Sequence, residues 1–431
     1  MRQPPRRFSA LRFLILAGVI GFLVYVNNRV VPLSPDIFLP TQTPTVSPEL
    51  FISQAEALAL EGKFSQAVLA FEKAIQADPK NPAVYLSASR LYIYTGKYEQ
   101  AFENAGNALL LNPDSSMAEA IKGLALGLQG TYFDAETSLN RAITIDPSNS
   151  SAYAYLSIII SQKIINGEET LGDLDRAIEA SRKAQSISPN AVETHWARGL
   201  VLEITSNYTE AVSELQAAVG QNPNVAAIHL ALGRNYRYLQ QYDKAIEEYT
   251  RANALNPADP MPETLISRTY ANIGEYAKAI QYAEQAVADA PGDAFMYGNL
   301  GVMYKQNFLY ESAIQVLRLA VQGGTSPEGI AVEGLTLNYG RIVEYYYNYG
   351  LALMELGYCG EAFPIAQSII QSMRDDPIAI YNANFIIQNC NEKANENQVL
   401  KLPTPTMFPT WTPQPSPTAT VLPTQQITAT P

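Results

Sequence analysis

The stretch Gly96–Pro113, GKYEQAFENAGNALLLNP, contains a pattern that returns along most of the 431-residue chain. The proline that closes it recurs with successive gaps of 34, 34, 42, 34, 34 and 34 residues, at Pro79, Pro113, Pro147, Pro189, Pro223, Pro257 and Pro291. The alanine at its centre recurs at Ala67, Ala101, Ala135, Ala177, Ala211, Ala245, Ala279, Ala313 and Ala362. A fixed period of this length indicates a supersecondary unit that must stack on its neighbours to bury its apolar face.

Each unit is predicted to contain two helices. The first carries apolar and aromatic residues at helical spacing, as in Tyr85, Ala88 and Tyr92. The second follows a turn glycine and has an aromatic residue near its start, as in Gly96 and Tyr98. Proline then ends the second helix, because it lacks an N–H group and disfavours helix in the preceding residue.

With these residues the chain resembles the tetratricopeptide repeat family, from about Pro48 to about Asp376. The resemblance implies an all-α fold, a right-handed superhelix of antiparallel helix pairs with a concave groove that binds peptides or proteins. We expect about nine helix pairs and a capping helix over Ile378–Lys393, whose apolar face includes Phe385 and Ile386, within a solenoid of residues 48–395. Two irregularities are predicted to be connections, a surface loop at 166–172 and a Gly-rich segment at 323–340.

The N-terminus is predicted to direct the chain to a membrane. Four arginines, the last of them Arg12, precede the uncharged apolar run Phe13–Val26. As a helix, this run would span about 21 Å, against roughly 30 Å for the hydrocarbon core of a bilayer. We expect an uncleaved transmembrane helix over residues 13–31, with a cleaved signal peptide and a buried core helix as alternatives. The positive-inside rule then leaves residues 1–12 in the cytoplasm and the repeats outside it.

Two segments are expected to lack a packed core. Residues 32–47 are rich in proline and threonine and are predicted to be an extended linker. Residues 396–431 are predicted to be a disordered tail, because no charged residue and eight prolines occur from Leu402 to Pro431. Their shared composition suggests exposed stalk material that carries O-linked glycans.

Composition argues against several classes of function. The net charge of -12 makes nucleic acid an improbable partner. We find no arrangement of residues for a catalytic centre, a cofactor, a metal ion or a small-molecule substrate. His195 and His229 occupy the same position in consecutive repeats and are predicted to be packing residues. Cys359 and Cys390 are predicted to lie at one edge of the last layer, where they form either a disulfide or two buried thiols.

The helical phase places a set of polar and aromatic residues on the inner face of the first helices. This set comprises Arg90, Tyr94, Tyr155, Trp196, Arg234, Arg237, Tyr238, Arg268, Asn272, Asn299, Lys305 and Tyr347. Arg234, Arg237 and Arg268 are expected to cluster where repeats six and seven meet. They would grip a carboxylate-bearing peptide while the aromatic residues take its apolar side chains. Alternatively, the arginines pair with acids of the chain itself, such as Glu203.

The sequence therefore predicts a membrane-anchored, extracytoplasmic scaffold that is not an enzyme and binds a protein or peptide in the concave groove. The alternative is a structural rod or spacer at the cell surface, whose groove has no dedicated ligand.

Overall fold

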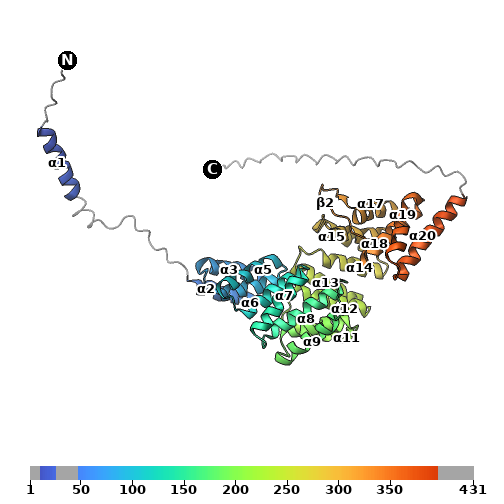
Figure 1. The fold of residues 1–431 in the computed structure, drawn as a ribbon, viewed down its shortest axis with the longest axis horizontal. Helices are drawn as coiled ribbons and strands as arrows, with labels where there is room; N and C mark the ends of the chain where they lie inside the picture. The colour runs from blue at the N-terminus through green and yellow to red at the C-terminus, as the bar shows by residue number, and fades with distance from the viewer. Residues whose placement is uncertain (1–9, 26–46, 397–431) are drawn as a thin grey trace, which may run out of the picture.

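The computed structural model describes residues 10–25 and 47–396, and in these ranges the fold is a stack of helix pairs with one small hairpin (Figure 1). Helices α2 to α19 form nine antiparallel pairs, and α20 follows as a single helix. The predicted all-α solenoid, its nine pairs and its terminal helix are confirmed. Each pair is one repeat, with a first helix of even number and a second helix of odd number.

The elements have these bounds: α1 Ala10–Tyr25, α2 Pro48–Leu60, α3 Phe64–Ala77, α4 Pro82–Tyr94, α5 Tyr98–Leu111, α6 Ser116–Leu128, α7 Tyr132–Ile145, α8 Ser150–Ile165, α9 Asp173–Ile187, α10 Val192–Ile204, α11 Tyr208–Gln221, α12 Ala226–Tyr238, α13 Tyr242–Leu255, α14 Met261–Asn272, α15 Tyr276–Asp289, α16 Ala294–Gln306, α17 Tyr310–Gln322, β1 Gly324–Thr325, β2 Ala331–Val332, α18 Arg341–Glu355, α19 Cys359–Ser372 and α20 Pro377–Glu396.

Small residues bring the two helices of a repeat together. A Cβ atom added at Gly301 in α16 would lie 2.3 Å from Leu317 Cγ in α17. Gly199 faces Leu215 in the same way, and Gly233 faces the ring of Tyr249. A carbon atom at such a distance cannot be accommodated in a close-packed interior without moving the neighbour. The repeating glycine and alanine positions are therefore set by the packing within each pair.

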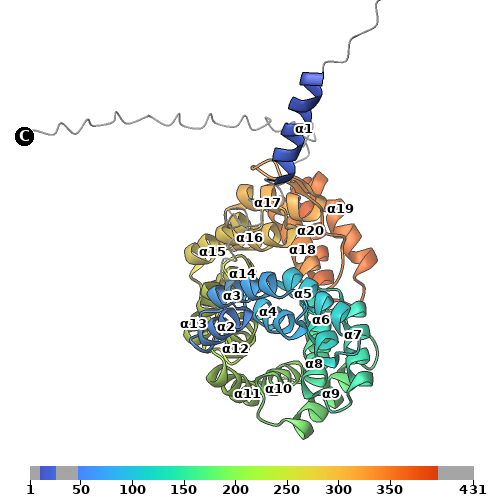
Figure 2. The same ribbon diagram turned by 90° about the vertical axis from the view of Figure 1, so that its left-hand side faces the viewer.

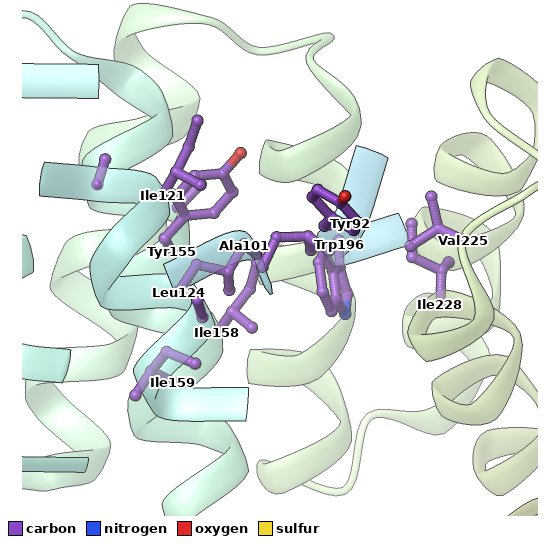
Figure 3. Close-up of a cluster of buried hydrophobic side chains, with 14 of the residues drawn as sticks. Tyr92, Ala101, Ile121, Leu124, Tyr155, Ile158, Ile159, Trp196, Val225 and Ile228 are labelled. Carbon is purple, nitrogen blue, oxygen red and sulfur yellow. The ribbon is translucent and has the colours of Figure 1, made fainter. Parts of the chain in front are cut away.

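The buried apolar residues form two main clusters. The first extends from Ala55 to Ile266, and Figure 3 shows part of it, with Ile121, Tyr155 and Ile159 packed between neighbouring helices. The second extends from Ala279 to Cys390. Helix α14 contributes Leu265 and Ile266 to the first cluster, but several of its other buried residues are polar, namely Glu263, Thr264, Ser267, Arg268 and Thr269. The core thus changes character at α14, where the two lobes of Figure 1 join.

The first two repeats close onto repeats five and six. A Cβ atom added at Gly62 would lie 2.3 Å from Asn224 Nδ2, and one at Gly96 would lie 2.2 Å from Asn256 Nδ2. The two glycines are in the turns of repeats one and two, and the two asparagines are in the loops that end repeats five and six. Figure 2 shows the resulting ring, in which α6, α8, α10 and α12 line the inside. Helix α2 lies over α12 and α13, and α3, α4 and α5 continue across the ring toward α6 (Figure 2). Successive turns of the superhelix are therefore in direct contact.

We expect Gly96→Ala to destabilise the chain more than Gly130→Ala. Both glycines have positive φ, 73° and 84°, so either alanine costs about 1–2 kcal/mol of backbone strain. No atom lies within 4 Å of a Cβ at Gly130, whereas at Gly96 the new methyl group meets Asn256 and adds about 1–3 kcal/mol. Chemical denaturation measures the difference. Adding Asn256→Ala to Gly96→Ala should recover most of the stability that Gly96→Ala loses beyond Gly130→Ala. If Gly96→Ala and Gly130→Ala lowered the free energy of unfolding equally, the two turns would not be in contact.

The insertion in the fourth repeat is held at its end by a buried carboxylate. Asp173, the first residue of α9, is buried and contacts Lys163 Nζ at 2.9 Å and Arg176 Nη1 at 2.9 Å. It also accepts hydrogen bonds from the backbone N–H and the hydroxyl of Thr170, at 2.7 and 2.9 Å. Glu168, Leu171 and the other residues from 166 to 172 are exposed, so the predicted surface loop is present with a fixed end.

This carboxylate predicts a dependence of stability on pH. Burial alone would raise the pKa of Asp173, but the hydrogen bonds from Thr170 and Lys163 outweigh it and lower the pKa to about 2, from 3.8. Because the pKa is lower in the folded state, the ionised carboxylate contributes its full stabilisation above pH 3.8. This contribution is lost as the pH falls through about 2. Asp173→Asn should therefore lower the free energy of unfolding by about 2 kcal/mol at pH 7. The free energy of unfolding of this variant should also fall less than that of the wild type as the pH is lowered. Denaturant titrations between neutral pH and pH 2 test this, with exposed Asp175→Asn as the control; equal pH profiles would contradict it.

The segment at 323–340 is more ordered than the Gly-rich sequence predicts. Strands β1 and β2 pair antiparallel, with Gly324 opposite Val332. Val332 is buried with Ala294, Tyr297 and Ala320, and the N–H of Leu335 donates to the carbonyl of Ala320 at 2.8 Å. The connection is therefore a small hairpin packed on repeat eight, not an open loop.

The described N-terminal helix is α1, whose apolar side chains from Phe13 to Tyr25 are exposed. Among the described residues, no helix combines the length and the apolar character that crossing a bilayer requires. The predicted transmembrane helix over 13–31 is thus not supported by the structure. Residues 1–9 and 26–46, with nearly all of the predicted linker, lie outside the described residues, as does the predicted tail from 397 onward.

Candidate functional site

The inner face of the first turn is occupied by the chain's own side chains. Three predicted residues of this face, Arg90, Tyr94 and Tyr155, lie near Glu193 of α10. Tyr155 and Trp196 are buried. The Tyr155 hydroxyl bonds to the Glu193 side chain, and burial together with that carboxylate holds the pKa of Tyr155 well above its usual range. Burial and Glu193 also raise the pKa of Tyr94, to about 12, and its hydroxyl bonds to Asn222 of repeat five. The closure of the ring thus draws these residues into internal contacts.

Arg234, whose side chain is 14% exposed, forms an ion pair with the buried Glu203. Its Nε and Nη2 atoms donate to the two carboxylate oxygens at 2.7 and 3.0 Å, which is the bidentate geometry of strong Arg–carboxylate pairs. Burial alone would lower the pKa of Arg234, but the charge of Glu203 outweighs it and raises the pKa. Repeats five and six are therefore joined at their inner faces by two charges that neutralise each other.

Arg237 and Tyr238 lie at the end of α12. The guanidinium carbon of Arg237 is 5.2 Å from the centre of the Tyr238 ring, and Tyr238 stacks on Tyr208 at 4.6 Å. Burial raises the pKa of Tyr249 to about 12, and the nearby charge of Arg237 acts to lower it. Within the described ranges the buried Nε of Arg237 has no hydrogen-bond partner. Tyr238 is exposed and is available to a ligand.

Arg268 reaches from α14 to α18, two repeats further along. Its Nη1 lies 3.2 Å from Glu344 Oε2, and its Nη2 lies 3.4 Å from the Tyr345 hydroxyl. Its Nε is buried and has no partner among residues 47–396. Arg234 and Arg268 thus bond to different repeats, and the contacts of the three arginines do not join them to one another. The alternative stated for these arginines, pairing with acids of the chain, is what the structure shows for Arg234 and Arg268.

Around Arg268, the inner face of the second lobe keeps accessible polar and aromatic side chains. We call this set the C-terminal inner face; it comprises Arg268 and Asn272 of α14, Phe295 and Lys305 of α16, and Glu344 and Tyr347 of α18. Asn272 and Phe295 are exposed, and Lys305 and Tyr347 are half-buried. Burial is the main cause that raises the pKa of Tyr347 to about 12, while the nearby Arg268 acts to lower it. Burial lowers the pKa of Lys305, against the charge of Glu355.

Three residues were placed differently or missed by the sequence. Asn299 was predicted for the inner face, but it is buried and donates to Ser267 Oγ at 3.3 Å. Phe295 and Glu344 were not predicted, although the helical phase that selected Lys305 and Tyr347 also passes through them. Nothing in the sequence indicates the bond between Arg268 and Glu344, because the two residues are 76 positions apart.

The histidines are packing residues, as predicted. His195 and His229 each bond through Nδ1, at 2.6 Å, to a glutamate of the second helix of the same repeat, Glu214 and Glu248. His229 Nε2 also donates to the carbonyl of Pro223 at 2.8 Å. Tyr85 and Tyr297 occupy the equivalent position in other repeats, and their hydroxyls donate in the same way to the carbonyls of Pro79 and Pro291. No group of residues suited to a metal ion occurs in the described part of the chain.

Cys359 and Cys390 are joined by a disulfide in the structure, with their Cα atoms 5.5 Å apart. The bond ties the start of α19 to the later part of α20. Of the two arrangements that the sequence left open, the structure contains the disulfide.

Comparisons with known proteins agree with this architecture. Three family models described as tetratricopeptide repeat match residues 58–125, residues 226–259, and residues 166–226 with 264–328. Together these matches include more than half of the chain. No curated protein matches it.

Several solved structures are similar to parts of the chain at low identity. PilF of Pseudomonas aeruginosa is 21% identical, with a TM-score of 0.38, over 48% of this chain and 91% of that chain. A tetratricopeptide repeat protein from Parabacteroides merdae is 14% identical, with a TM-score of 0.38, over 59% and 98%. Yeast Tom70 is 12% identical, with a TM-score of 0.42, over 82% and 98%. At these values the likenesses carry no argument about a partner. From the repeats in its sequence, its stacked helix pairs and the matching family models, the chain belongs to the tetratricopeptide repeat family.

Proposed function

We propose that the chain is a non-enzymatic scaffold that binds a protein or peptide on its C-terminal inner face. Tetratricopeptide repeat proteins are generally scaffolds for protein interactions, and the stacked first helices provide such a surface here. The observation that carries the choice of surface is Arg268. Its guanidinium is nine-tenths buried, and its Nε has no partner in the described residues, beside the half-buried Tyr347. A buried donor without a partner is rare, and a ligand carbonyl or carboxylate would satisfy it.

The chemistry of this surface favours a peptide that presents both an acceptor and an apolar group. Lys305 supplies a half-buried positive charge, and the carboxylate of Glu355 acts on it. Phe295 supplies an exposed ring, which packs edge-on against Tyr345 with the ring centres 6.3 Å apart. Rigid aromatic side chains beside a cation are the residues that dominate binding at protein interfaces. A segment with a carboxylate near an apolar side chain complements them.

The test compares partner capture by the full chain with that by two variants of this surface. Lys305→Glu and Tyr347→Ala should each reduce capture of the same partners at least about tenfold, because both remove groups that a ligand would contact. Lys73→Glu is the matched control, since Lys73 is exposed on α3, a second helix on the outside of the array. Equal capture by wild type and both variants would reject the C-terminal inner face.

The same experiment tests the alternative of a structural rod. One observation favours that alternative for the first six repeats, because their inner face is filled by Tyr155, Trp196 and the pair of Arg234 and Glu203. A chain that captures no partner through either lobe would be a spacer.

We further propose that the chain is attached to a membrane by residues 13–31, with its repeats on the extracytoplasmic side. The arginines before the apolar run support the orientation, and the bond between Cys359 and Cys390 supports an oxidising compartment. Cell fractionation of the full chain and of a chain that starts at Pro48 tests the attachment. If both remain in the supernatant after membranes are sedimented, this proposal is wrong.

A further inference from the structure

The terminal helix α20 leaves an apolar face in water. In α16, which packs on α18, the residues Met296, Leu300 and Met303 are buried. A second row of residues, one position further along, has the same spacing in both helices, Tyr297, Gly301 and Tyr304 in α16 and Ala379, Ala383 and Ile386 in α20. Gly301 packs on Leu317 of α17, and all three residues of this row in α20 are buried. This alignment makes Ile378, Asn382 and Phe385 the counterparts of the three buried residues of α16. Helix α20 therefore presents the face on which another helix would stack.

The exposed fractions show that this face is uncovered. Ile378 is 64% exposed, Tyr381 is 68% exposed and Phe385 is 40% exposed. The rings of Tyr381 and Phe385 stack on each other with their centres 6.4 Å apart. In Figure 1, α20 forms the end of the array, and no other described helix lies on its outer side. The sequence predicted that Phe385 would belong to the apolar face turned toward the array, but it belongs to the outer face. Terminal repeats usually present a polar outer face, whereas this one exposes Ile378, Tyr381 and Phe385.

We propose that this face joins two copies of the chain. From Pro377 to Asn391 the sequence of α20 contains no charged residue, although the chain carries a net charge of -12. Two acidic chains repel each other, so they approach at least cost where both surfaces are uncharged. Identical surfaces pair most simply about a two-fold axis, which makes the two α20 helices antiparallel. An axis near Asn382 places Ile378 of each copy opposite Phe385 of the other.

The disulfide prepares α20 for this contact. Cys390 lies one turn beyond Ile386, and its bond to Cys359 fixes that part of α20 on α19. A helix that is already ordered loses little conformational entropy when a second helix packs on it. The proposed surface is distinct from the C-terminal inner face, so that the dimer could form with or without a peptide bound there.

Sedimentation equilibrium of the full chain tests the proposal. We expect a monomer–dimer equilibrium in which Phe385→Glu and Tyr381→Glu each weaken association at least about tenfold, because each buries a charge at the two-fold contact. Leu110→Glu is the control, since Leu110 is an exposed apolar residue, 82% accessible, on α5. It should leave the association constant unchanged. Circular dichroism of each variant checks that the helices remain folded.

Cross-linking locates the contact independently. A cysteine placed by Asn382→Cys lies near the proposed axis and should give a covalent dimer with a short bis-maleimide, whereas Asn391→Cys should not. The two native cysteines are bonded to each other and do not react. A full chain that stays monomeric at the highest concentration attained, or a dimer that both glutamate variants leave unchanged, would overturn the proposal. A monomer whose α20 amides are nonetheless protected from hydrogen exchange would point to residues after 396 as the occupant instead.

Discussion

Replacing Glu203 with alanine is expected to lower the free energy of unfolding by about 3–5 kcal/mol. The substitution leaves the guanidinium of Arg234 without its bidentate partner in a buried position. Removing one member of a buried ion pair is costly, because the remaining charge has lost its hydration and gains nothing in return. We expect the loss to appear first in repeats five and six, as faster hydrogen exchange of the amides in α10 and α12.

The control is the double variant Glu203→Met, Arg234→Met. It removes both charges and keeps an apolar side chain at each position, so it should recover most of the stability lost by Glu203→Ala. Glu247→Ala serves as a comparison, since Glu247 is exposed and pairs with Arg251 on a helical surface where such pairs contribute little. If Glu203→Ala were no worse than Glu247→Ala, Arg234 would be free to bind a ligand, as the sequence first suggested. The experiment therefore separates the structural role of this arginine from the binding role.

The repeat period predicts contacts between neighbours, and these agree with the structure. The turn conformation also follows from the period, even at positions where the expected glycine is absent. Ser206, Gln240 and Phe308 take its place with φ of 62°, 59° and 61°, in the region that glycine normally occupies. The packing of the whole pair thus imposes a backbone conformation that the local residue does not favour.

Contacts between distant repeats could not be predicted from the period. The approach of Gly96 to Asn256 depends on the small rotation between successive repeats, summed over four of them. An error of a few degrees in each rotation would separate the two turns. The bond from Arg268 to Glu344 is of the same kind, since it passes over the whole of repeat eight. The inner-face residues could be assigned by helical phase, but not which of them the chain itself would occupy.

Removing the disulfide is expected to lower the stability of the last layer by about 4 kcal/mol at most, from a closed loop of 31 residues. The double variant Cys359→Ala, Cys390→Ala tests this, because alanine leaves no polar atom at the buried position of Cys390. Helices α19 and α20 pack on each other and on α18, so the effect should remain local to this end of the array. Hydrogen exchange should quicken in α19 and α20 while the amides of α8 and α10 keep their protection.

Chemical reduction of the wild-type chain supplies the matched control, since it breaks the same bond without changing a residue. Reduced wild type and the alanine variant should show the same local opening, and intact mass under non-reducing conditions identifies the bonded form. Equal protection of α20 in the oxidised and reduced chains would contradict the prediction. Because α20 also presents Tyr381 and Phe385, reduction should weaken the proposed self-association as well. A dimer that persists while α20 opens would have to be formed by another surface.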